Sequence, residues 1–435
     1  MKQKSLRNDL KFDDNLFFRK LENAFLKQCR YFGYQEIKTS TIEPLHIFTS
    51  LGTLSDAKLK RMYSFIDWDG WSGERVVLKP DSTACVARFY SDHLYAENPK
   101  QKLCYVENHF EWADSGDVLS ERWQCGIENI GNKKMKTDIE VIYMAYKVLQ
   151  EIGFNDVHLY LSYPAYIKAL IDIFHTQEQD KKELEAAIKN SDTERIKAIC
   201  NTDKEKEILE NSLLADGSAG HLKNLKTLLQ GAEFKKIRSL LDNFIRLCEL
   251  LDKLKCPYKI DFSRLGDLKY YTGIWFQFRS RPTKKPDRDI LCAGGRYDNL
   301  IADMIRLLNG NKQDPTTVPP VPAVGFAFYV RNILNERHIS EHTGALSNNL
   351  QNINIYICNI SARNVETGQW LSDEFLRLGF TPRITFSKVK REQYESFGLV
   401  IEVDHESFND GYQILFSQKI GKPLLVNLFG GLNGR

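Results

Sequence analysis

The sequence predicts an α+β protein in which an antiparallel sheet is flanked by helices, carries a helical insertion and is followed by a small α/β domain. Short strand patterns bounded by turn residues occur before the middle of the chain and again after it. Charged segments with helical periodicity separate the two groups. Near the end, strands and helices alternate, which is typical of an α/β unit. We therefore expect a core of residues 1–162 and 256–338, a helical insertion at 163–255 and a small domain at 350–435.

Composition excludes several classes of protein. The 435 residues carry a net charge of +3, which gives no electrostatic case for binding nucleic acid. No apolar run approaches the length of a membrane span, and the first residues lack the apolar segment of a signal peptide. The nine cysteines have no paired spacing, which predicts free thiols in a reducing, cytoplasmic setting. His338 and His342 lack a third ligand, so we expect no metal and no cofactor.

The first third of the chain alternates helix and strand. A helical pattern ends at Gly33, as helices often do at glycine. Lys79-Pro80-Asp81-Ser82-Thr83 then leads into a predicted helix that runs to Arg88. Asp81 and Thr83 have two interpretations: this junction is a helix cap, or its carboxylate and hydroxyl accept hydrogen bonds from a ligand's amino group. Strands are expected at 34–41, 60–68, 75–78, 103–110 and 122–130.

The strand at 122–130 places polar side chains on one face. Gln124, Gly126 and Glu128 alternate along it and therefore point to the same side of the sheet. A buried hydrogen-bonding wall would explain this pattern, and so would a half-exposed strand with its polar side in water.

A tyrosine pair and a glycine turn mark a second candidate site. The stretch from Asp267 to Phe278 reads as a strand on which Tyr270 and Tyr271 point to opposite faces. Gly294 and Gly295 lack a Cβ, so backbone or ligand can approach closely there, next to Arg296-Tyr297-Asp298. We interpret this as a pocket for a small polar molecule; ordinary aromatic pairs in a hairpin are the alternative.

The second half contains further elements of both kinds. A helix is expected at 137–152 and a short strand at 157–162, followed by the charged helices of the insertion. Residues 323–334 read as a strand that turns into a helix. After 353 the order is strand, helix, strand, short charged helix, strand.

Several motifs together resemble the class II aminoacyl-tRNA synthetases, and specifically the histidyl-tRNA synthetase lineage. The resemblance covers most of residues 10–335, and the tail looks like a shortened anticodon-binding domain. It implies the class II synthetase-like fold. The matching motifs are LKPDSTACVAR (78–88), QCGIE (124–128), DLKYYTGIWFQF (267–278), CAGGRYDNL (292–300) and AVGFAF (323–328).

The resemblance implies a histidine-binding pocket. By motif, the groups near the ligand's α-amino group are Asp81, Thr83 and Gln124. The groups that hold the imidazole are Glu128, Tyr270 and Tyr271. The glycine turn with Gly294, Gly295 and Arg296 supports the pocket, and Arg296 matches a largely structural arginine.

The catalytic arginines of that lineage do not carry over. Their positions fall at Glu111, Asn332 and Gly266, and a small glycine of the family is Tyr329, whose ring could fill the space for adenine. Activation by ATP depends mainly on stabilising negative charge. We therefore expect no adenylation and no catalytic residue. The proline of the family's first motif appears as Ser40, which bears on dimerisation.

A histidine-binding fold without synthetase catalysis resembles the regulatory subunits of ATP phosphoribosyltransferase. That resemblance implies histidine as the regulatory ligand, a short-form catalytic subunit as partner, and a homodimer or hetero-oligomer. The alternatives are an active histidyl-tRNA synthetase or a derived ligase, and an amino-acid-binding module that partners another enzyme. The tail has no basic excess, which disfavours tRNA.

Overall fold

The structure is a computed structural model, and the chain forms two compact units, Met1–Ala345 and Leu346–Arg435. The helices of the expected insertion belong to the first unit, and the expected bounds of core, insertion and tail stay a prediction. The structure describes residues 9–51, 54, 56–68, 73–112, 121–213, 219–264, 271–280, 289–310, 318–342, 355–358, 365–377, 383–384, 399–403 and 412–417.

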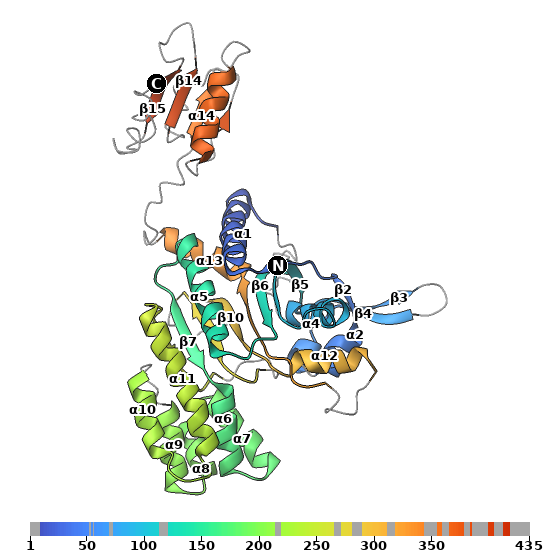
Figure 1. Ribbon diagram of the computed structural model, residues 1–435, viewed down its shortest axis with the longest axis vertical. Coiled ribbons are helices and arrows are strands. Elements are labelled where there is room, and N and C mark those ends of the chain that lie inside the picture. Colours follow the sequence, from blue (N-terminus) through green and yellow to red (C-terminus); the bar gives the residue numbers. More distant parts are fainter. Residues whose placement is uncertain are drawn as a thin grey trace, which may run out of the picture. The chain divides into compact units, whose positions relative to one another are not determined.

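A mixed sheet of eight described strands forms the centre of the first unit (Figure 1). Neighbours from β5 to β7 run antiparallel, and the short strands β1 and β8 add to the two edges in parallel. The antiparallel sheet predicted from the sequence is thus confirmed. In spatial order the strands are β1 (Gln35–Glu36), β5 (Gln101–Phe110), β6 (Glu121–Ile130), β11 (Ala323–Tyr329), β10 (Ile290–Arg296), β9 (Trp275–Arg279), β7 (His158–Ser162) and β8 (Tyr258–Ile260).

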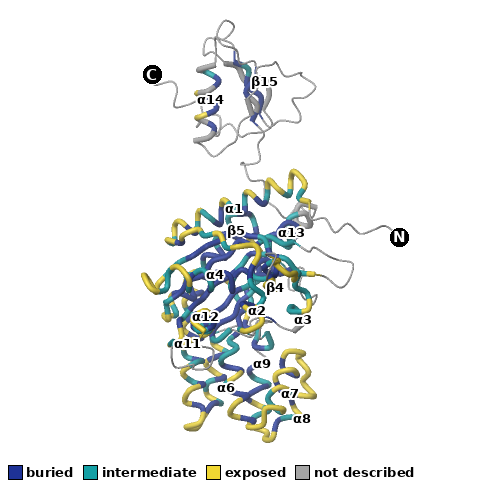
Figure 2. The backbone as a smooth tube through the Cα atoms, turned by 90° about the vertical axis from the view of Figure 1, so that its right-hand side faces the viewer, coloured by how far each residue is buried: buried dark blue, intermediate teal, exposed yellow. Residues whose placement is uncertain are grey.

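One face of the sheet is covered by α1 (Phe12–Phe32), α5 (Met135–Ile152) and α13 (Val330–His342). The apolar stripe of α1 faces the sheet, and the ring of Phe25 lies 6.2 Å from that of Phe328 on β11. Figure 2 shows the buried residues gathered at the centre of the first unit and exposed residues along its outer segments.

The opposite face packs against α2 (Leu45–Ser50), α4 (Ser82–His93) and α12 (Leu300–Leu308), which form a second apolar cluster. Strand β6 divides its side chains between the two faces. Cys125 and Ile127 belong to the cluster with α1 and α5, so Gln124 and Glu128 point the other way.

A small sheet with the order β2-β4-β3 extends from this second face. It consists of β2 (Ile42–Pro44), β4 (Gly73–Leu78) and β3 (Ser64–Trp68), and α3 (Asp56–Leu59) precedes β3. The strand expected at 34–41 is much shorter in the structure, because the backbone N–H and hydroxyl of Thr39 bind the carboxylate of Glu107 and take that residue out of strand pairing.

The charged middle of the chain folds into helices, as predicted. These helices lie between β7 and β8 in the sequence. Since β7 and β8 pair with each other, the chain leaves the sheet after β7 and returns next to β7 as β8. The long helix α11 buries Ile237, Leu241, Phe244 and Leu251 at helical spacing. The helices are α6 (Pro164–Phe174), α7 (Glu178–Lys189), α8 (Thr193–Ile199), α9 (Asp203–Leu213), α10 (Ala219–Leu228) and α11 (Lys235–Lys253).

The second unit contains a four-stranded sheet with the order β13-β12-β14-β15 and one described helix. The first three strands are parallel and β15 is antiparallel, so β15 adds a strand that we did not predict. The expected short charged helix lies outside the described residues. The elements are β12 (Ile355–Cys358), α14 (Val365–Arg377), β13 (Arg383–Ile384), β14 (Leu399–Val403) and β15 (Tyr412–Ser417). Among the helices described in both units, none has the length and apolar character needed to span a membrane.

Candidate functional site

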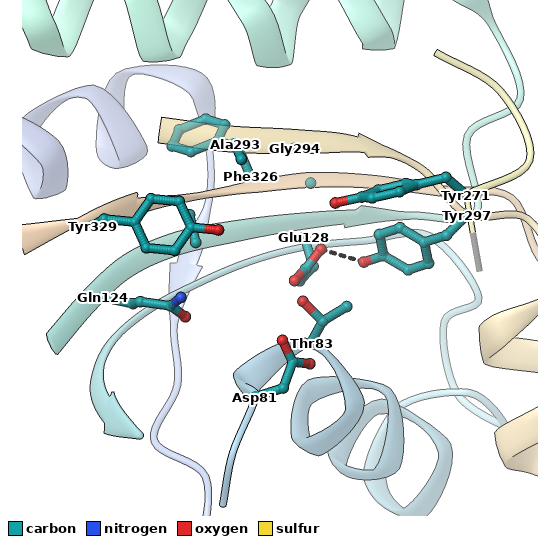
Figure 3. A pocket seen from close by; sticks show the side chains of 12 residues that line it. Asp81, Thr83, Gln124, Glu128, Tyr271, Ala293, Gly294, Tyr297, Phe326 and Tyr329 are labelled. Carbon is teal, nitrogen blue, oxygen red and sulfur yellow. Dashed lines mark hydrogen bonds between the residues drawn. The ribbon is translucent and has the colours of Figure 1, made fainter. Parts of the chain in front are cut away.

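A narrow pocket opens on the α4 side of the central sheet, where β6, β11 and β10 lie next to one another (Figure 3). It gathers five of the six residues that the sequence assigned to a ligand; the sixth, Tyr270, lies outside the described residues. The lining residues are Asp81, Thr83, Gln124, Glu128, Tyr271, Ala293, Gly294, Tyr297, Gly325, Phe326, Ala327 and Tyr329.

Strand β6 supplies the floor of the pocket. Of the two interpretations of its polar face, the buried wall is correct, since Gln124 and Glu128 are only 7% and 2% exposed. Glycine on the neighbouring strand β11 makes room for the carboxylate. A Cβ on Gly325 would lie 1.9 Å from Oε2 of Glu128.

Asp81 and Thr83 enter the pocket from the start of α4. The Asp81 carboxylate caps this helix by accepting a hydrogen bond of 3.2 Å from the backbone N–H of Ala84. The helix-cap interpretation is thus confirmed for Asp81, which also lines the pocket with Thr83. Their contact with a ligand's amino group stays a prediction. In Figure 3 the carboxylates of Asp81 and Glu128 lie on either side of the Thr83 hydroxyl.

Burial makes both carboxylates resist ionisation. It raises the pKa of Glu128 to about 8, against the opposing effect of hydrogen bonds from Tyr297 and Thr83, and the charge of Asp81 adds to the rise. Burial also raises the pKa of Asp81, while Lys58 and the backbone N–H groups of α4 lower it. The raised pKa of Glu128 therefore favours the protonated form of its carboxyl at neutral pH.

Three tyrosines complete the walls. The hydroxyl of Tyr297 donates a hydrogen bond to Glu128, and burial together with that carboxylate raises the pKa of Tyr297. The hydroxyls of Tyr271 and Tyr329 point toward the centre of the pocket (Figure 3). We did not assign Tyr297 to the ligand from the sequence. It follows the end of β10 at Arg296, so strand alternation does not place its side chain.

The predicted strand with two tyrosines is corrected by the structure. Strand β9 begins only at Trp275, so Tyr271 precedes it. The chain bends there because the N–H groups of Thr272 and Gly273 both donate to the carbonyl of Arg296. A Cβ on Gly273 would lie 2.9 Å from Cδ of that arginine, so glycine allows the close approach.

The supporting residues have distinct roles. Gly294 lines the pocket, and a Cβ there would lie 2.3 Å from the carbonyl oxygen of Gly325 on β11. Gly295 does not line it; a Cβ at this residue would lie 2.7 Å from the ring of Tyr271, so the glycine seats that ring.

Arg296 stays outside the pocket and is structural. Its guanidinium is 2.7 Å from Asp138 and 3.1 Å from Asp298, and it donates to the carbonyl of Asn132 at 3.1 Å. This ion pair joins the end of β10 to the start of α5.

Comparison with known proteins places the chain in a family. The family described as histidyl-tRNA synthetase matches residues 8–333. An ATP phosphoribosyltransferase regulatory subunit from Dehalococcoides mccartyi is 36% identical over 330 residues, which cover 75% of either chain. This chain belongs to the family of ATP phosphoribosyltransferase regulatory subunits. A histidine–tRNA ligase from Caldicellulosiruptor bescii is more distant, with 26% identity over 373 residues, 81% of this chain and 77% of that one.

Solved structures confirm the histidyl-tRNA synthetase-like fold. One, described as an ATP phosphoribosyltransferase regulatory subunit/histidyl-tRNA synthetase from Bacillus halodurans, superposes with a TM-score of 0.67 at 21% identity and covers 92% of this chain and 97% of its own. A histidyl-tRNA synthetase from Nostoc sp. PCC 7120 has a TM-score of 0.66 at 16% identity, with 91% and 89% covered.

In this regulatory subunit, the positions matched to synthetase arginines have other partners. Glu111 lies 3.2 Å from Arg61 and 3.2 Å from Arg122. Its negative charge is thus balanced by these two arginines. The side-chain amide of Asn332 donates to the carbonyl of Ile290 at 2.8 Å. Gly266 lies outside the described residues.

The regulatory subunit shows no metal centre in the part of the chain that the structure describes, where no three histidine, cysteine or acidic side chains gather in a way that could hold an ion. The nine cysteines are free and buried, as the sequence predicted.

Proposed function

We propose that this regulatory subunit binds histidine in the pocket and transmits its presence to an ATP phosphoribosyltransferase catalytic subunit, without catalysing a reaction itself. The observation that carries the proposal is the meeting of Asp81 and Glu128 with tyrosine hydroxyls in one buried pocket. An ammonium group needs hydrogen-bond acceptors, and an imidazole N–H is well matched by a carboxylate.

The partner is inferred from the family. The relatives in Dehalococcoides mccartyi are named as regulatory subunits of ATP phosphoribosyltransferase, which implies a separate catalytic subunit. Feedback requires only that histidine bind two states of the complex with different affinity, and a coupling of about 1–3 kcal/mol is typical.

Loss of adenylation is supported by the former arginine positions. Glu111 and Asn332 carry no guanidinium, and both side chains have partners within the protein. The Tyr329 ring lines the pocket on the side of β11. Phosphoryl chemistry relies on cations that neutralise developing charge. Arg61 and Arg122, each 3.2 Å from Glu111, are paired with its carboxylate.

Co-expression with a short-form catalytic subunit tests the proposal. We expect the two chains to purify as one complex, and a catalytic subunit that elutes alone in every condition would contradict the partnership. The Trp370→Glu variant, which changes a residue of the second unit, shows whether that unit takes part in the contact.

A histidine-activating enzyme is the second candidate, because the histidyl-tRNA synthetase family also matches this chain. Pyrophosphate exchange separates the two. Histidine-dependent exchange above the level of a no-enzyme blank would favour the synthetase, and its absence from a sample that binds histidine would favour the regulatory role.

A further inference from the structure

The pocket holds two buried carboxyl groups without a cationic partner among its described lining residues. Asp81 and Glu128 are the acidic groups among its lining residues, and no lysine, arginine or histidine lines it in the part of the chain that the structure describes. The remaining polar groups are neutral: the hydroxyls of threonine and tyrosine and the amide of Gln124.

Three basic residues close to the pocket are paired with acidic residues outside it. Lys79 lies two residues before Asp81, and its ammonium is 2.7 Å from Glu107. Arg88, on the pocket helix α4, is 2.8 Å from Glu43. Arg296, next to Tyr297, is 2.7 Å from Asp138.

The electrostatic surroundings of the two carboxylates agree with this arrangement. The groups that act on Glu128 are Tyr297, Thr83 and Asp81, none of them a cation. Lys58 acts on Asp81, but burial outweighs it and the pKa of Asp81 remains raised. A positively charged ligand would therefore supply the missing countercharge, whereas a ligand carboxylate would meet acidic groups and only neutral donors among the lining residues that the structure describes.

We propose that the pocket recognises its ligand as a cationic amine attached to an imidazole ring and does not read the ligand's carboxylate. This inference rests on the proposed binding of histidine and narrows the ligand class: imidazole amines without a carboxylate are ligands as good as histidine. The carboxylate of histidine itself faces away from Asp81 and Glu128, toward the mouth of the pocket.

Four probes separate the contributions of ring, amine and carboxylate. Isothermal titration calorimetry of the full chain is carried out with L-histidine, L-histidinol, histamine and imidazole-4-propionate, which keeps the ring and carboxylate but lacks the amine. We expect the dissociation constants of histidinol and histamine to lie within about threefold of that of histidine or below it. Imidazole-4-propionate is expected to bind at least about thirtyfold more weakly than histamine.

Histidine that binds more than about threefold more tightly than both carboxylate-free amines would overturn the inference and leave the proposed function intact. Imidazole-4-propionate that matches histamine would overturn it as well. Binding of the amines without any effect of histidine on the enzyme complex would instead contradict the proposed function. Failure of all four to bind would contradict both.

Two variants assign the effect to this site. Asp81→Asn is expected to weaken histamine and histidine alike, by at least about tenfold. Glu111→Gln, which removes a paired carboxylate outside the pocket, is expected to change neither by more than about twofold. Because Asp81 also caps α4, circular dichroism of Asp81→Asn checks that the helix remains. Equal affinities of Asp81→Asn and the unmodified chain would contradict the assignment of ligand binding to this pocket.

Discussion

Under the proposed function, Glu128 is the pocket side chain whose charge state a cationic ligand would change. It is 2% exposed, hydrogen-bonded by Tyr297, and surrounded by no cation among the groups that act on it. Burial disfavours the ionised form of this carboxylate, and a cationic ligand would offset that penalty. The free energy of binding therefore depends on Glu128 more than on any neutral group that lines the pocket.

Replacing Glu128 by glutamine tests this dependence. The amide keeps the size of the side chain but cannot carry the negative charge, so the affinity for histidine is expected to fall at least about tenfold. Titration calorimetry measures the change, and Glu111→Gln serves as a charge-matched control outside the pocket. An unchanged dissociation constant for Glu128→Gln would show that histidine does not contact this residue.

The affinity for histidine should depend on pH. The pKa of Glu128 is raised to about 8, so its protonated form is favoured near pH 7 and a cationic ligand must expel that proton. Binding therefore releases protons near pH 7 and strengthens as the pH rises toward 8, as long as the ligand amine stays charged. Calorimetry in two buffers of different ionisation enthalpy measures the release, which should disappear in Glu128→Gln; proton uptake by the unmodified chain would contradict the assignment.

At the scale of elements, periodicity located the site residues better than it located the turns. Alternation on β6 predicted which side chains share a face, because successive side chains on a strand point to opposite faces of the sheet. The bend before β9 could not be predicted, because it depends on the Arg296 carbonyl, which arrives from β10 through tertiary contact. Tyr297 was missed for the same reason: its hydroxyl is placed by Glu128 of β6, far away in the sequence.

The partners of Glu111 were also beyond prediction from local sequence patterns. The sequence identified Glu111 as a replacement but not its partners, since Arg61 and Arg122 come from a loop and another strand. The ion pair between Glu111 and Arg122 depends on the register of β5 with β6, in which His109 faces Arg122. That register cannot be predicted from a local sequence pattern.

The ion pair between β10 and α5 should stabilise the first unit. Arg296 and Asp138 have side chains 8% and 10% exposed, so Arg296→Ala leaves a buried carboxylate without its main partner. We expect a loss of about 3–5 kcal/mol in the free energy of unfolding, measured by chemical denaturation. The control is Lys27→Ala, which removes a pair whose lysine is 67% exposed and is expected to cost less than about 1 kcal/mol. Equal losses in the two variants would contradict the structural role of Arg296.

Strand β3 offers apolar side chains to a second chain. Phe65, Ile66 and Trp68 are 41%, 48% and 66% exposed on an edge strand, where free backbone groups and apolar side chains favour association. We expect the full chain to self-associate through this strand and Trp68→Glu to reduce the mass measured by light scattering. Trp370→Glu, at an exposed tryptophan of the second unit, is the control. A mass unaffected by Trp68→Glu would place the contact elsewhere.

For the whole molecule, the pocket and the family membership point in one direction. The fold is that of histidyl-tRNA synthetases, the similarity is to regulatory subunits, and the buried carboxylates suit a cationic amine. A regulator needs the pocket to change its surroundings on binding. The proton on Glu128 gives one physical route, since its departure alters the charge at the junction of β6, β11 and α4.

The most direct test is the histidine response of the reconstituted complex with a short-form catalytic subunit. We predict that histidine inhibits turnover of the complex with the unmodified chain. The complex with Glu128→Gln should keep the uninhibited rate and require at least about tenfold more histidine for the same inhibition. Inhibition that is identical in the two complexes, or absent from both, would contradict the claim that this pocket is the regulatory histidine site.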